Sequence, residues 1–193
     1  MEKTDFFSEM NCYVSVDVET AGPNPSDYAM LSIGACTIMH PRQTFYCELK
    51  PDRENSDPSA LEISRLSIDE LQKNGTDPEK ALLDFEGWLS SVVPAGKRPL
   101  FVAFNAPFDW MFVNDYFFRY LKRNPFGYSA IDTKAVYMGC NAVPWSGTSM
   151  KDLQLQEYEV HPLSHNALQD AIDQADIFEA ILKQLVIRSG KSA

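Results

Sequence analysis

Residues 12–19 read Cys-Tyr-Val-Ser-Val-Asp-Val-Glu, and this alternation predicts the first strand of the chain. Successive side chains of a strand point to opposite faces of its sheet, so the valines share one face while Asp17 and Glu19 share the other. The turn-forming residues of 22–26 end the strand. The strand therefore has an apolar face and a face that carries two neighbouring carboxylates.

Patterns typical of strands and of helices follow one another along the chain. Strands are predicted at 12–19, 29–39, 43–50, 99–104 and 128–131, the first three as sequential antiparallel neighbours. Helices are predicted at 58–63, 67–73, 77–91, 107–121, from 132 onward, at 149–157 and at 166–188. This order predicts an α/β fold in which helices flank both faces of a mixed five-stranded sheet. The whole chain, 1–193, is expected to be a single domain with its core at 12–187.

The composition is that of a globular protein. Of the 193 residues, 45% are hydrophobic and 23% are charged. No apolar run is long enough to span a membrane, and Met1–Met10 lacks the apolar core of a secretion signal. The four cysteines form no CxxC pair, which favours buried thiols in a reducing cytoplasm. The net charge of −10 argues against a large basic nucleic-acid-binding surface, but it does not exclude a nuclease whose carboxylates bind metal cations.

The carboxylates of the first strand are the first candidate metal ligands. Asp17 and Glu19 are two residues apart on one face, where two anions repel each other unless a cation lies between them. Oxygen ligands of this kind select Mg²⁺ or Mn²⁺. The alternative, that both side chains simply face water, stays open on this pair alone.

Two further segments carry candidate catalytic residues. Asp109 lies in the first turn of the helix after strand 99–104, at a junction where α/β sheets bind ligands and where the helix dipole favours a carboxylate. His165 precedes the last helix, and Asp170 lies near the first turn of that helix. An imidazole beside a metal-binding carboxylate suits a general base. Taken singly, Asp109 is also explained by the helix dipole alone, and His165 by a surface position.

Three ordered segments carry these residues and their neighbours. They are Asp17-Val-Glu19-Thr20, Asn105-Ala-Pro-Phe108-Asp109 and His165-Asn-Ala-Leu-Gln-Asp170-Ala. In residue type, order and place on the predicted elements they resemble the motifs of the DEDDh 3′→5′ exonucleases. That superfamily has a ribonuclease H-like fold and includes DnaQ-type proofreading subunits, ribonuclease T and oligoribonuclease. The resemblance covers residues 12–187 and implies the same fold and activity for this chain.

The resemblance implies a role for each catalytic residue. Asp17 would bridge two Mg²⁺ or Mn²⁺ ions, and Glu19 and Asp170 would complete the protein ligands of the first ion. Asp109 would hold the second ion mainly through water. His165 would be the general base that takes a proton from the attacking water.

It also implies where the substrate lies. The backbone after Glu19, near Thr20 and Ala21, would hold the 3′-terminal nucleotide, and Asn105 and Phe108 are the other predicted substrate contacts. Aromatic faces can stack on unpaired bases. Trp145 is a further candidate for such a contact, although a role without substrate is the simpler interpretation.

The sequence therefore predicts a metal-dependent exonuclease that releases nucleoside 5′-monophosphates from single-stranded 3′ ends. Phe104 and Ser64 stand where many members of the superfamily carry histidine, which leaves the choice between DNA, RNA and very short RNA open. A non-catalytic nucleic-acid-binding domain and an endonuclease of the same fold are the alternatives. The oligomeric state is not decided by the sequence, and a homodimer is one of the states left open.

Overall fold

The computed structural model describes residues 12–155 and 164–189, and within them five strands form one sheet. The strands are β1 (Tyr13–Thr20), β2 (Met30–Thr37), β3 (Thr44–Glu48), β4 (Leu100–Ala103) and β5 (Ala130–Asp132), in the order β3-β2-β1-β4-β5. β1 pairs antiparallel with β2, and β2 with β3, whereas β4 is parallel to both β1 and β5. The predicted mixed five-stranded sheet is confirmed.

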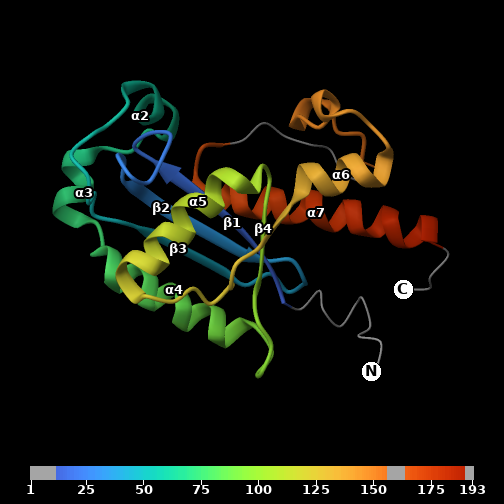
Figure 1. Ribbon diagram of the computed structural model, residues 1–193, viewed down its shortest axis with the longest axis horizontal. Helices are drawn as coiled ribbons and strands as arrows, with labels where there is room; N and C mark the ends of the chain where they lie inside the picture. The colour runs from blue at the N-terminus through green and yellow to red at the C-terminus, as the bar shows by residue number, and fades with distance from the viewer. Residues whose placement is uncertain (1–11, 156–163, 190–193) are drawn as a thin grey trace.

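Helices cover both faces of this sheet, as predicted. They are α2 (Pro58–Ser64), α3 (Ile68–Asn74), α4 (Pro78–Val92), α5 (Ala106–Tyr116), α6 (Thr133–Asn141) and α7 (Ala167–Ser189), with short turns η1 (Phe117–Leu121), η2 (Trp145–Gly147) and η3 (Met150–Asp152). In Figure 1, α7 runs along one face of the sheet, while α4 and α5 lie over the other.

β1 is buried on both of its faces because each face meets an apolar helix surface. On one side, Val16 belongs to a core that includes Phe85 of α4 and Phe112 of α5. On the other side, Tyr13 packs edge-on against Phe178 of α7, with 5.8 Å between the ring centroids. The face of β1 that carries the carboxylates is therefore covered by α7 and does not simply face water.

The helix predicted at 107–121 is α-helical only as far as Tyr116 and then continues as the π-helical turn η1. The Tyr116 hydroxyl accepts a hydrogen bond from the Met30 backbone N–H at 2.7 Å and donates one to the Asp52 carboxylate. These bonds fix the end of α5 against the sheet and against the loop after β3.

The prediction of a helix at 149–157 is wrong for the residues that the structure describes. Only η3 is helical, and Leu153 that follows it is extended. The Gln154 backbone N–H donates to the Tyr137 hydroxyl at 3.0 Å, so this donor is used by a side chain of α6 instead of by a helix. Residues 156 and 157 lie outside the described part of the chain.

The start of α7 packs directly on the sheet at Gly34. Gly34 lies opposite Asp17 in the pairing of β2 with β1. A Cβ atom at Gly34 would lie 2.2 Å from the backbone carbonyl carbon and oxygen of Ala167, far closer than non-bonded atoms approach. The absence of a side chain at this position therefore lets α7 begin beside the carboxylates of β1.

Replacing Gly34 by alanine is expected to destabilise the protein by about 1–3 kcal/mol or more, because backbone and not a flexible side chain would have to move. Activity should fall as well, because α7 carries part of the site. Thermal unfolding measures the first effect. Gly87→Ala is the matched control: nothing lies within 4 Å of its Cβ position in α4, and this change should stabilise the protein by about 0.5–1 kcal/mol. Equal stability of the two variants would contradict the close packing of α7.

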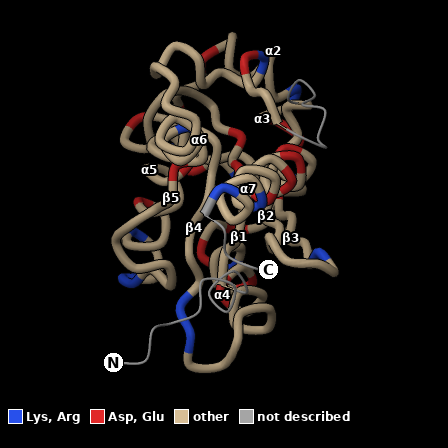
Figure 2. Tube along the Cα trace, turned by 90° about the vertical axis from the view of Figure 1, so that its right-hand side faces the viewer, with Lys and Arg blue, Asp and Glu red and all other residues tan. Residues whose placement is uncertain are grey.

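The surface follows the composition. Figure 2 shows Lys and Arg scattered along the described chain among more numerous acidic positions, without one large basic face in that view. All four cysteines are free, and Cys12 and Cys36 are buried. None of the described helices is long and apolar enough to cross a membrane. The segment examined for a secretion signal, 1–10, lies outside the described residues.

Candidate active site

The predicted catalytic residues all line one pocket, which has a volume of about 290 Å³. It is lined by Asp17, Val18, Glu19, Phe104, Asn105, Phe108, Asp109, His165, Asp170 and Gln174. These residues come from β1, from the junction of β4 with α5, and from the start of α7. Three segments that are far apart in the sequence are thus brought together by the fold. Asn105 and Phe108, two of the predicted substrate contacts, are among the lining residues.

Thr20 and Ala21, the other predicted substrate contacts, do not line this pocket. Both are buried. The Thr20 hydroxyl donates to the Gly22 carbonyl at 2.9 Å, and the Ala21 N–H donates to the Ala29 carbonyl at 2.8 Å. The polar groups of this turn are therefore used in holding the chain after β1, and its contact with a nucleotide stays a prediction.

Asp17 and Asp109 are the most enclosed carboxylates of β1 and α5, at 8% and 4% exposure. The Val18 backbone N–H donates to Asp109 Oδ1 at 3.2 Å, which ties the first turn of α5 to β1. Asn105 just before α5 has a left-handed backbone, with φ of 68°. This sharp turn aims α5 so that its first turn faces β1.

Burial, and then the charges of neighbouring carboxylates, raise the pKa values of Asp17, Glu19 and Asp109. Burial raises the pKa of Asp17 well above its usual value, and the charges of Asp109, Glu19 and Asp170 add to the effect. Burial, and then the charge of Asp170, raises the pKa of Glu19 to about 7. Burial raises the pKa of Asp109 to about 8, against the opposing effect of the hydrogen bond from the Val18 N–H. Such a group of anions is stable at neutral pH only when protons or cations compensate the charge.

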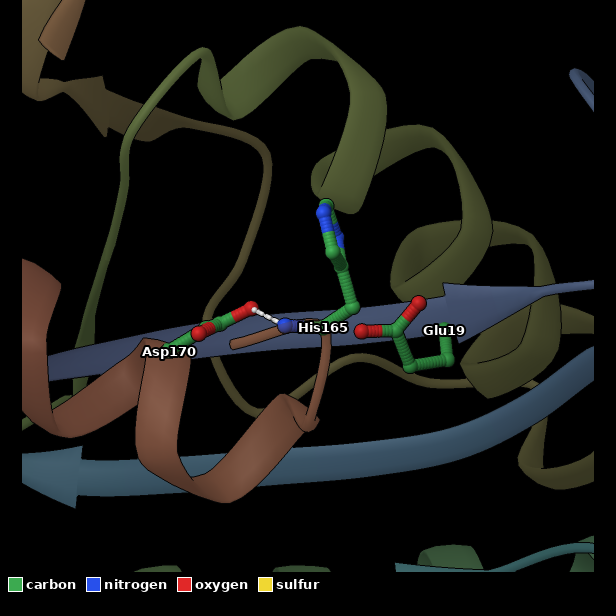
Figure 3. A group of neighbouring side chains, drawn as sticks. All are labelled: Glu19, His165 and Asp170. Atoms are coloured by element: carbon green, nitrogen blue, oxygen red, sulfur yellow. Dashed lines mark hydrogen bonds between the residues drawn. The ribbon is translucent and has the colours of Figure 1, made fainter. Parts of the chain in front are cut away.

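His165 and Asp170 are held together at the start of α7. The His165 backbone N–H donates to Asp170 Oδ2 at 2.9 Å, while the Ser164 N–H and hydroxyl donate to Oδ1 at 2.7 and 2.9 Å. His165 has a left-handed backbone, with φ of 57°, and the predicted cap, Asn166, accepts from the Gln169 N–H at 3.1 Å. In Figure 3 the imidazole projects away from the Asp170 carboxylate, and Glu19 of β1 lies on the other side of the His165 backbone.

Glu19, His165 and Asp170 form the tightest group of potential metal ligands in the pocket. One ligand atom from each lies within 4.8 Å of the others. This grouping differs from the predicted one, in which Asp17 joins Glu19 and Asp170 while His165 acts only as a base. The predicted roles themselves stay predictions.

Gln174 is the functional residue that the sequence interpretation missed. It is 1% exposed, its amide nitrogen donates to Asp17 Oδ1 at 2.7 Å, and its amide oxygen accepts from the Phe104 N–H at 2.8 Å. It therefore holds Asp17 in place and joins the end of β4 to α7. The available signal was a polar residue on the apolar side of α7, one turn after Asp170.

Comparison with known proteins identifies the family. Residues 12–182 match the family described as the 3′-5′ exoribonuclease Rv2179c-like domain. The chain belongs to this family. A relative in Escherichia coli, named the 3′-5′ DNA exonuclease Cap18, is 43% identical over 177 residues, which are 91% of this chain and 94% of Cap18. The predicted class of enzyme, a 3′-5′ exonuclease, is thereby confirmed at the level of the family.

Solved structures show the same fold at low sequence identity. The nuclease domain of 3′hExo, a DEDDh family member solved bound to rAMP, has a TM-score of 0.70 at 15% identity and aligns over 89% of this chain and 91% of its own. Escherichia coli Exonuclease I, solved with a dA16 oligonucleotide, has a TM-score of 0.62 at 17% identity over 91% of this chain and 40% of its own. The predicted ribonuclease H-like fold is confirmed.

The donor set of this Rv2179c-like domain fits a divalent metal, which the family also implies. Carboxylate oxygens predominate, as Mg²⁺ and Mn²⁺ require, and Glu19, His165 and Asp170 are close enough to share one ion. The raised pKa values of Glu19 and Asp109 mean that their ionised forms are disfavoured in the folded protein. A bound cation would neutralise these negative charges.

The metal-free Rv2179c-like domain is expected to lose stability as the pH rises. The folded-state pKa values of Glu19 (about 7) and Asp109 (about 8) lie above their usual values, so their contribution is complete at low pH and is lost as the pH rises through these values. Thermal unfolding in EDTA should show a lower Tm at pH 8 than at pH 5, by about 2–4 °C for each kcal/mol lost. Added Mn²⁺ should restore stability mainly at pH 8. The Glu19→Gln variant should show a smaller dependence on pH, and an unchanged dependence would contradict the assignment.

Replacing Gln174 by leucine should slow catalysis and destabilise the fold. The change leaves Asp17 Oδ1 and the Phe104 N–H without this partner, at a cost of about 1–3 kcal/mol. Because groups that orient metal ligands typically contribute about 10–100-fold to metal affinity or activity, the metal concentration at half-maximal rate should rise within that range. Gln169→Leu, an exposed change on the same helix, should leave that concentration unchanged.

Proposed function

We propose that this chain is a divalent-metal-dependent 3′→5′ exonuclease that releases nucleoside 5′-monophosphates one at a time from the 3′ ends of single-stranded DNA. The observation that carries the proposal is the meeting of the predicted Asp, Glu and His residues of three distant segments in one pocket. The identity of 43% with a protein named as a DNA exonuclease favours DNA as the substrate.

The proposed roles are those that the family resemblance implies, and the presence of all five side chains in one pocket supports them. Asp17, Glu19 and Asp170 would hold one metal ion, and Asp109 would hold a second through water. Two bound Mg²⁺ or Mn²⁺ ions supply neutralisation of the phosphodiester, acidification of the attacking water and stabilisation of the leaving oxygen. His165 accepts the proton of that water as its oxygen bonds to phosphorus.

The bond between phosphorus and the 3′ oxygen of the preceding nucleotide breaks in the same reaction. The 3′ oxygen takes a proton from solvent, so the products are a nucleoside 5′-monophosphate and a strand one residue shorter with a free 3′ hydroxyl. The imidazole of His165 releases its proton to solvent before the next cycle. The pocket, of about 290 Å³, is of a size that supports binding of the end of a strand.

RNA is the second candidate substrate, because the description of the family names an exoribonuclease. The two substrates differ by the 2′ hydroxyl, which a protein can detect directly. The comparisons give no support to a homodimer. A cytoplasmic location stays a prediction.

Digestion of matched 5′-labelled single-stranded DNA and RNA of the same sequence, in Mg²⁺, in Mn²⁺ and in EDTA, tests the proposal on a denaturing gel. We expect a metal-dependent ladder that shortens from the 3′ end, with DNA cut faster. Faster digestion of RNA would transfer the proposal to RNA. A circular single strand should stay uncut, and cutting would indicate an endonuclease. No digestion of either linear strand by the folded protein would favour a non-catalytic binding domain.

A further inference from the structure

The edge of the sheet that holds the pocket extends beyond the carboxylates. β1, β4 and β5 are parallel, so their carboxyl ends lie at the same edge. Glu19 lies at the end of β1, Phe104 follows β4, and Lys134 follows β5 in the first turn of α6. Neighbouring strands are about 4.8 Å apart, so this row leads from the carboxylates toward the outer strand of the sheet.

Lys134 connects the pocket with an exposed tryptophan. Its Nζ lies 5.9 Å from the centroid of the Phe104 ring, and Phe104 lines the pocket. The same Nζ lies 4.4 Å from the centroid of the Trp145 ring. Trp145 is 51% exposed in the short turn η2. A cation and an aromatic face thus lie next to each other just outside the catalytic residues.

The helix dipole does not favour Lys134 at this position, because it disfavours a positive charge in the first turn of a helix. The first turn of α6 holds no acidic residue, and the carboxylate of its N-cap residue, Asp132, accepts the Ala135 N–H at 3.0 Å. Among the ion pairs of the described residues, none includes Lys134. Among the described residues that line the pocket there is neither Lys nor Arg. Lys134 therefore adds, at the border of the pocket, the positive charge that an anionic strand requires.

The direction of the strand follows from the same geometry. The scissile phosphate belongs at the carboxylates, and the 3′-terminal nucleotide is expected on the side of Glu19 and Phe108. The rest of the strand must leave by another side. Phe104 lines the pocket after β4, and Lys134, with its Nζ 5.9 Å from the centroid of the Phe104 ring, follows the neighbouring strand β5. In Figure 1, α6 extends on the side of the molecule opposite to α2 and α3.

We propose that Trp145 and Lys134 bind the nucleotide on the 5′ side of the scissile bond. Trp145 stacks on the base, and Lys134 pairs with the phosphate on the 5′ side of that nucleotide. The inference rests on the proposed exonuclease function and adds to it a second nucleotide site. Since stacking on an indole requires an unpaired base and accepts any base, the site selects single strands without selecting a sequence.

Substrates that lack one feature each test this site. The reference is a trinucleotide; the second substrate is the same trinucleotide without its middle base; the third is the dinucleotide without a 5′ phosphate, which lacks the phosphate assigned to Lys134. The value of kcat/KM is measured for the unaltered protein and for Trp145→Ala, Trp145→Phe and Lys134→Met. Tyr128→Ala is the control, because Tyr128 is an aromatic residue with 86% exposure that does not line the pocket.

For the unaltered protein and for Tyr128→Ala, removal of the middle base should lower kcat/KM by about 5- to 50-fold. For Trp145→Ala, kcat/KM should be the same for the trinucleotides with and without the middle base. Trp145→Phe should keep most of the difference in kcat/KM between these two substrates. Lys134→Met should keep the preference for the base but lose the preference for the trinucleotide over the dinucleotide. A Trp145→Ala variant that still distinguishes the two trinucleotides as the unaltered protein does would overturn the inference, as would an equal loss on all three substrates.

Failure of the proposed function would appear differently, as no cleavage of any substrate by the unaltered protein. Binding of a labelled single strand with phosphorothioate linkages, followed by fluorescence anisotropy, still tests the site in that case. Weaker binding by Trp145→Ala and Lys134→Met than by Tyr128→Ala supports the nucleotide site. Equal binding by all of them, or no binding by the unaltered protein, rejects it.

Discussion

The Asp17→Asn variant is expected to lose turnover by about 10³-fold or more, because metal ions contribute several kcal/mol to phosphoryl transfer and each 1.4 kcal/mol is about tenfold in rate. Asn has the shape of Asp but lacks the charge. The negative charges of Asp109, Glu19 and Asp170 act on the Asp17 carboxylate. The same carboxylate accepts a hydrogen bond from the Gln174 amide. Asp170→Asn should have a similar effect.

The stability of the metal-free Asp17→Asn protein should not fall and should rise at pH 8. The folded-state pKa of Asp17 is raised by burial and by neighbouring anions, so its ionised form opposes folding above its usual pKa. Single-turnover rates in Mn²⁺ and thermal unfolding in EDTA measure the two effects. Asp69→Asn, an exposed change in α3, should leave turnover unchanged. Near-normal turnover of Asp17→Asn would reject the metal assignment.

The His165→Ala variant should lower kcat by about 10²–10⁴-fold and leave KM nearly unchanged, as expected for a general base. The backbone N–H of His165 donates to Asp170. An imidazole nitrogen lies within 4.8 Å of a Glu19 carboxylate oxygen, so the imidazole is placed to reach a water molecule beside Glu19. Removal of the side chain should disturb neither the backbone hydrogen bond nor α7.

Added imidazole should restore part of the lost activity of His165→Ala, an effect that a purely structural role would not produce. His40→Ala is the control. His40 is exposed and pairs with Glu179, and it does not line the pocket. An effect of His165→Ala confined to KM would remove His165 from the role of base. It would favour a ligand role, since His165 lies within 4.8 Å of Glu19 and Asp170.

Much of the fold could be predicted because its elements have local signals. The alternation of residues 12–19 and the apolar run that became β2 identify strands, and the pattern of α7 identifies a long helix. The helix predicted at 149–157 lacked a comparable signal, and the Gln154 N–H of this segment donates to Tyr137 of another helix instead. The change to a π turn after Tyr116 likewise depends on partners from distant segments, Asp52 and Met30.

By itself, the sequence determined the types of the candidate catalytic residues, their order along the chain and the elements that carry them, because each motif extends over a few neighbouring residues. Only the tertiary structure decided that Asp17, Asp109 and Asp170 share one pocket, and that burial and then neighbouring charges raise the pKa values of Asp17 and Asp109. Desolvation and charge repulsion depend on distances between separate segments. The roles of Gly34 and Gln174 were decided in the same way. Gly34 leaves room for α7, and Gln174 joins α7 to β1 and to the end of β4. Both act through contacts with residues that are far away in the sequence.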